Sequence, residues 1–203
     1  MRHRLTLLLM LWCGNVAAQM PTEGVSLTIV LKQQNVPAPV LNAMRRETEM
    51  AVQPAGMQLA WTPHDHVGEI SGSIAIIQLR GDCSPGAPIR TVFSQHRVGE
   101  PLGQTHVVDG KVLPFADILC NAVRRVVDRD LRVVPVGQRD EVLGRALGRV
   151  LAHELYHIVL HTMDHSPHGL ARSEQSSREL LAPVGAFTED DDRRIAEFAA
   201  GGR

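Results

Sequence analysis

The feature that most constrains the fold is a long amphipathic segment between Asp140 and His161. Apolar residues recur in it at intervals of three and four, which is typical of a helix with one face buried in the core. This apolar stripe consists of Val142, Leu143, Leu147, Val150, Leu151, Leu155 and Ile158. We therefore predict a helix over residues 140–161, the longest in the chain.

Five consecutive residues of this helix, His153-Glu154-Leu155-Tyr156-His157, form an HExxH motif. Positions 153 and 157 are about 40° apart around a helix and ~6 Å apart along it, so both imidazoles lie on one face. Such a pair can bind one metal ion, with Zn–N distances near ~2.1 Å. Glu154 lies beside them, where it is placed to take a proton from a metal-bound water rather than to bind the metal.

A zinc ion needs a third protein ligand. On a straight helix His161 lies ~12 Å of rise beyond His153, so it reaches the same ion only where the helix unwinds. The chain must otherwise turn back after the helix. This favours His165 as the third ligand, and His168, the carboxylate of Glu174 and His161 are the alternatives.

The segment HELYHIVLHTMDHSPHGLAR at residues 153–172 resembles the zinc-dependent metallopeptidases of the zincin superfamily, especially metzincin-like proteins. It is also similar to a group of exported bacterial proteins that carry HELYH or HELGH. In metzincins a third histidine follows the HExxH helix after a tight turn. The chain departs from their pattern at Leu160, where metzincins have a glycine, and at Met163, where they have the third histidine.

The resemblance implies that His153, His157 and His165 bind Zn²⁺ and that Glu154 is the general base. It implies an exported metallopeptidase that hydrolyses peptide bonds through a zinc-bound water activated by Glu154. The alternative is a noncatalytic exported domain whose structural zinc site is closed by a fourth protein ligand. An exported binding module without metal is a third interpretation.

The residues that precede the HExxH helix alternate between apolar and polar, as strands do. Three strands are expected at residues 25–31, 57–61 and 74–79, and the third is apolar enough to be central. Asp109-Gly110 separates two further strand-like segments at residues 104–108 and 111–113. This dipeptide predicts a hairpin, since a type I′ turn needs two residues with positive φ.

Helices other than the HExxH helix are expected at residues 37–52, 116–127 and 173–181 and from Thr188 onward. Thr188 and Asp191 resemble a capping box. Because strands come early and long helices late, the fold class predicted is α+β. We expect a zincin-like domain in which a small mixed sheet packs on helices, one of them the long HExxH helix.

The N-terminus has the pattern of a signal peptide. Arg2, His3 and Arg4 precede an apolar run at residues 5–12, and Val16-Ala17-Ala18 is a pattern that signal peptidase reads. The apolar run is shorter than the roughly 20 residues that span a bilayer. We expect a signal peptide over residues 1–18, one domain over residues 19–203, and a secreted or periplasmic protein.

Cleavage near Ala18 removes Cys13 and leaves Cys83 and Cys120, which we expect to form a disulfide in an exported protein. The formal net charge of −1 gives no electrostatic reason to expect nucleic acid or an anionic membrane as a partner. Aromatic residues make up 3%, too few for a surface that stacks bases. The expected partner is a peptide or protein substrate. The mature protein is expected to be monomeric and not to associate with a membrane.

Overall fold

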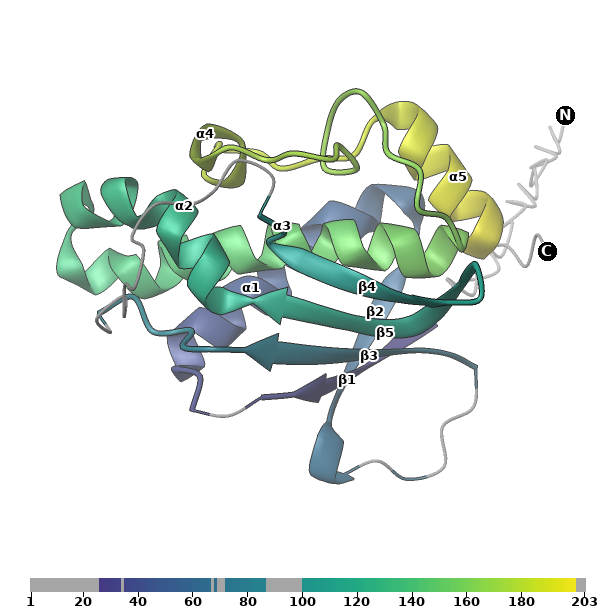
Figure 1. The fold of residues 1–203 in the computed structure, drawn as a ribbon, viewed down its shortest axis with the longest axis horizontal. Coiled ribbons are helices and arrows are strands. Elements are labelled where there is room, and N and C mark those ends of the chain that lie inside the picture. The colour runs from purple at the N-terminus through teal and green to yellow at the C-terminus, as the bar shows by residue number, and fades with distance from the viewer. Residues whose placement is uncertain (1–25, 34, 67, 69–71, 87–99, 200–203) are drawn as a thin grey trace, which may run out of the picture.

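Alternating apolar residues build a five-stranded sheet at the base of the molecule (Figure 1). The computed structural model describes residues 26–33, 35–66, 68, 72–86 and 100–199. Its strands are β1 (Ser26–Lys32), β2 (Gln58–Pro63), β3 (Ser73–Arg80), β4 (Gly103–Val108) and β5 (Lys111–Leu119). Its α-helices are α1 (Ala38–Val52), α2 (Cys120–Val133), α3 (Arg139–Leu160), α4 (Ser177–Leu180) and α5 (Glu189–Ala199).

The sheet is mixed and has the order β2-β1-β3-β5-β4. Four strands are parallel to their neighbours, and β4 pairs antiparallel with β5 at one edge. The central place predicted for the third strand is confirmed, since β3 lies between β1 and β5. The predicted hairpin is confirmed as well, with φ of 50° at Asp109 and 74° at Gly110. A mixed sheet with helices is consistent with the predicted α+β class.

One predicted helix is wrong at its start. Residues 116–119 extend β5, where Ile76 to Arg80 of β3 pair with Phe115 to Leu119, and α2 begins only at Cys120. Ala116 and Ile118 are buried, while Asp117 bonds Arg80 and His106 of the neighbouring strands. Pairing within the sheet overrides the local helical pattern here.

Helix α3 packs closely on α1, and two glycines allow the approach. A Cβ atom at Gly144 would lie 2.4 Å from the carbonyl oxygen of Val40, and one at Gly148 would lie 2.6 Å from that of Met44. Thr48 of α1 donates to the carbonyl of Gly148 across this contact. The predicted stripe of α3 is buried from Leu143 to Ile158, so the helix runs through the middle of the core.

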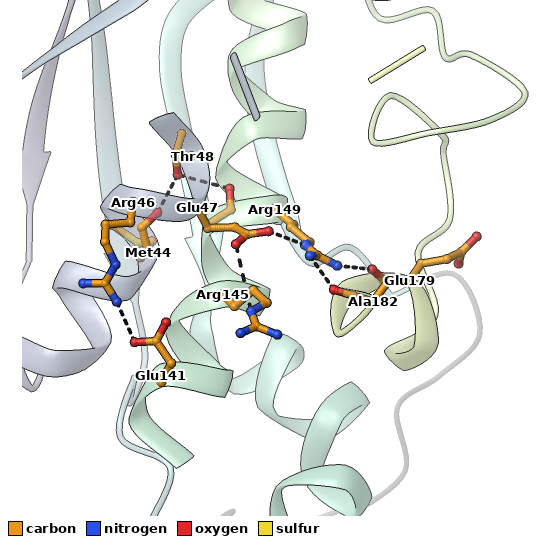
Figure 2. A network of polar contacts seen from close by, with 10 residues as sticks. Met44, Arg46, Glu47, Thr48, Glu141, Arg145, Arg149, Glu179 and Ala182 are labelled. Carbon is orange, nitrogen blue, oxygen red and sulfur yellow. Dashed lines mark hydrogen bonds and ion pairs between the residues drawn. The ribbon is translucent and has the colours of Figure 1, made fainter. Parts of the chain in front are cut away.

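A buried arginine ties α3 to the C-terminal part of the chain (Figure 2). Arg149 is fully buried, and its Nε donates to Glu47 of α1 over 2.7 Å. Its two other nitrogens donate to the carbonyls of Glu179 and Ala182. Because Arg149 lies one turn before the HExxH motif, this network holds the segment around α4 against the part of α3 that leads into the motif.

The ends of the shorter helices follow from their caps. Ser176 and Glu179 form a capping box, so α4 begins at Ser177 and is shorter than the helix predicted over 173–181. The predicted cap of the last helix is confirmed, because Thr188 Oγ1 accepts from the Asp191 amide and Asp191 accepts from the Thr188 amide.

The expected disulfide between Cys83 and Cys120 is present and joins the turn after β3 to the start of α2. The segment interpreted as a signal peptide, residues 1–18, lies outside the described residues. Among the residues that the structure does describe, no helix is both long and apolar enough to cross a membrane.

Candidate metal centre

Three histidines converge at the C-terminal half of α3. His153 and His157 project from one face of the helix, and their Nε2 atoms are 3.1 Å apart. His165 comes back from the following loop, and one nitrogen from each ring lies within 4.8 Å of the other two. Two nitrogens bound to one tetrahedral zinc ion at ~2.1 Å would be ~3.4 Å apart, so the spacing of His153 and His157 fits a shared metal ion, and His165 is near enough to be its third ligand.

The loop that returns His165 begins with a left-handed residue. Helix α3 ends at Leu160, and His161 takes φ of 48° and ψ of 39°. The amide of Thr162 then donates to the carbonyl of His157, which closes the last turn of the helix. The chain thus reverses without the glycine that metzincins use, at a cost of about 1 kcal/mol for a non-glycine residue in this conformation.

His165, the favoured third ligand, belongs to the cluster, and the alternative residues do not. The cluster formed by the described residues contains His153, His157 and His165 and does not include Glu174 or His168. Glu174 lines the same cavity. His161 packs edge-on against the ring of Phe198 in α5.

Hydrogen bonds fix the protonation of both helix histidines. The Nδ1 atom of His153 is 2.7 Å from the carbonyl oxygen of Leu170, and that of His157 is 2.9 Å from the carbonyl of Thr162. Because a carbonyl can only accept, each Nδ1 carries the proton, and each neutral ring turns an unprotonated Nε2 toward the shared centre. Burial lowers the pKa of His153 to about 4 and also lowers the pKa of His157. Lone pairs that face each other in this way suit a cation between them.

This arrangement predicts the behaviour of the metal-free protein. At pH 7 His153 and His157 should both be neutral with the proton on Nδ1, as ¹H–¹⁵N correlation spectra of the rings can show. Since the native pKa of His153 lies below that of a free histidine, the unfolded chain takes up a proton first as pH falls. Acidification from pH 6.5 to 5 should therefore lower the free energy of unfolding by about 1.5 kcal/mol through His153. The raised pKa of Glu154 contributes with the opposite sign over this range, so the test is made in Glu154→Gln, where a stability that rises on acidification would contradict the assignment.

Glu154 is buried beside the cluster and faces the edge strand β4. Its Oε2 atom accepts from Thr105 Oγ1 over 2.7 Å. Burial is the main influence on the carboxyl and raises the pKa of Glu154 to about 7, although the bond from Thr105 opposes this rise. A carboxyl with its pKa near neutrality can both accept and return a proton at physiological pH.

The cluster and Glu154 line a cavity of about 830 Å³. Its walls come from β4, α2, α3 and the segment that leads into α4. Leu102, Val126 and Val150 give this cavity an apolar side. The charged residues on its walls include two ion pairs, Arg125 with Glu100 and Arg172 with Glu179. A cavity of this size is typical of a site for a small molecule or a peptide segment.

Several residues that support the site were not predicted from the sequence. Tyr156 stacks on Phe187 with ring centroids 5.8 Å apart, and its hydroxyl accepts from Arg194 of α5. The Tyr156 ring also packs edge-on against His157 and so provides an apolar support for it. Leu170, Thr162 and Thr105 act through contacts that no sequence motif marks.

Comparison of the chain with models of protein families, with curated proteins and with solved structures gives no match. The residues of the site are therefore the basis for assigning a function.

Proposed function

We propose that this protein is an exported zinc-dependent metallopeptidase with a zincin-like domain. The observation that carries the proposal is that three ligand side chains, and not four, converge among the described residues. Structural zinc sites are closed by four protein ligands, whereas catalytic sites keep one position open. The three histidines line a cavity of about 830 Å³ that also contains the buried carboxyl of Glu154, and a zinc ion that they held would be accessible from this cavity.

The donor set favours zinc. Imidazoles suit Zn²⁺ well, and His153, His157 and His165 offer three of them. The carbonyl partners of His153 and His157 orient two of the rings before any metal binds, which raises metal affinity. A bound zinc ion would supply a Lewis acid that acidifies water and polarises a carbonyl.

Glu154 is the residue proposed to move the proton. It lies next to His153 in the sequence, lines the same cavity and is not part of the metal cluster. Its carboxylate would accept a proton from the attacking water and pass it to the amine that leaves the cleaved peptide bond. In this proposal three imidazoles bind the metal and one carboxyl transfers the proton.

Two further features support an exported enzyme that acts on peptides. The Cys83–Cys120 disulfide is typical of oxidising compartments. β4, an edge strand of the sheet, lies along the cavity, and the exposed edge of a strand can pair with an extended peptide.

Metal analysis of the protein purified without chelator tests the proposal together with a peptide-library assay. We expect X-ray absorption to show one zinc ion bound by three histidines. We also expect peptide cleavage that a chelator stops and that added Zn²⁺ restores. His165→Ala should weaken zinc binding by roughly 100-fold or more, since each ligand carries a share of the binding free energy. His168→Ala, in the same loop but outside the cluster, is the matched control. Four protein ligands around the metal would favour a structural site instead.

A further inference from the structure

Two residues of β4 enclose the side chain of Glu154. Gly103 and Thr105 are two positions apart on the strand and so lie on the same face of the sheet. Thr105 is 4% exposed, and its hydroxyl lies 2.7 Å from Glu154 Oε2 and 3.3 Å from the Glu154 carbonyl oxygen. A hydroxyl donates only one proton, and the shorter contact to a carboxylate is the stronger hydrogen bond. Thr105 therefore holds Oε2.

Gly103 provides room for the other carboxylate oxygen. A Cβ atom at this position would lie 2.5 Å from Glu154 Oε1 and 2.8 Å from its Cγ. Gly103 is not among the glycines with positive φ, so its backbone conformation does not require a glycine. The neighbouring backbone is fixed, because Leu119 donates to the carbonyl of Leu102 and Gly103 pairs with Ile118. Any larger residue at 103 would displace the Glu154 side chain.

We infer that Gly103 and Thr105 form a seat for the carboxylate of Glu154 and that Thr105 is a positioning residue for the general base. This inference rests on the proposed peptidase function. With Oε2 held by the hydroxyl, Oε1 is the oxygen left to take a proton inside the cavity.

The seat sets the position of Glu154 without touching the metal cluster. Thr105 belongs to a strand, whereas His153 and His157 belong to α3 and His165 to the loop after it. Loss of the Thr105 hydroxyl should therefore affect the proton-transfer step and leave metal binding intact. A displacement of a catalytic group by about 1 Å can lower a rate by roughly 100-fold. A small rotation of a carboxylate should lower the rate by less.

Three variants test this role in the zinc-loaded protein. Thr105→Val keeps the shape of the side chain but removes the hydroxyl, and we expect kcat to fall about 10-fold with KM and zinc content unchanged. Thr105→Ser restores the donor and should recover most of kcat. Gly103→Ala should lower kcat at least as much as Thr105→Val, because it pushes on Oε1. Thr62→Val, in a strand at the opposite edge of the sheet, is the control and should match the wild type.

Crystal structures of the zinc-loaded Thr105 variants provide a readout that needs no substrate. We expect the carboxylate of Glu154 to rotate away from β4 in Thr105→Val and to stay in place in Thr105→Ser. An unmoved carboxylate, or an equal kcat in Thr105→Val and the wild type, would overturn the inference. A wild-type protein that binds zinc and cleaves no peptide would overturn the proposed function, and the crystal structures alone would then support or overturn the seat.

Discussion

Replacement of Glu154 by glutamine should lower the rate of peptide hydrolysis by about 10³-fold and leave zinc bound. Glutamine has nearly the same shape, and its carbonyl oxygen can still accept the hydrogen bond from Thr105. It cannot take a proton from water at any pH near neutrality, and general acid–base catalysis contributes about 10²–10⁴-fold to such reactions. The measurement is kcat/KM on a cleaved peptide beside the zinc content of each protein.

The matched control for this variant is Glu174→Gln. Glu174 is a carboxylate that lines the same cavity but is exposed and lies outside the metal cluster. Its substitution likewise replaces a carboxyl of the cavity by an amide. A purely electrostatic effect on substrate binding would therefore lower kcat/KM in both variants. If Glu154→Gln kept more than about a tenth of the wild-type rate, Glu154 could not be the general base.

The two helix histidines could be predicted from the sequence, because their spacing follows the period of an α-helix. Two histidines four residues apart on a helix must share a face, and the apolar stripe shows that this helix is buried. The Asp109-Gly110 turn was predictable for a similar reason, since its two residues with positive φ are encoded within the turn itself.

The return of His165 could be predicted only as the favoured one of several choices. If the two helix histidines bind a metal ion, a third ligand must come from elsewhere, and the sequence favours His165 without excluding His161, His168 or Glu174. The path of the loop depends on contacts that span it, such as the Ser166 amide with the carbonyl of Ala171 and the Leu170 amide with that of Ala186. These contacts fix the loop whose Leu170 carbonyl also orients His153.

Features that depend on distant partners could not be predicted. Thr105 lies 49 residues before Glu154, and only the pairing of β4 with β5 brings them together. Ala116, Ile118 and Leu119 are apolar and suit either a helix or a strand, and their place beside β3 decides between the two. Arg149 is a fully buried charged residue of α3, and its partner Glu47 lies 102 residues away.

This buried pair leads to the second large prediction (Figure 2). Arg149→Met should lower the free energy of unfolding by about 3–5 kcal/mol, because it leaves Glu47 charged and buried without its main partner. For a protein of this size that corresponds to a fall in Tm of about 10 °C. The carbonyls of Glu179 and Ala182 also lose their donors, so the segment around α4 should loosen from α3. Thermal unfolding and hydrogen exchange of residues 176–185 measure the two effects.

The same two helices provide the control for Arg149→Met. Arg46 of α1 and Glu141 of α3 form an ion pair of 2.6 Å, but their side chains are 54% and 49% exposed. Arg46→Met should therefore change the stability by no more than about 1 kcal/mol. If the cost in Arg149→Met comes from the unpaired charge, adding Glu47→Gln should recover part of it, as a double-mutant cycle can measure. Equal losses in Arg149→Met and Arg46→Met would show that burial of the Arg149–Glu47 pair adds nothing to the stability.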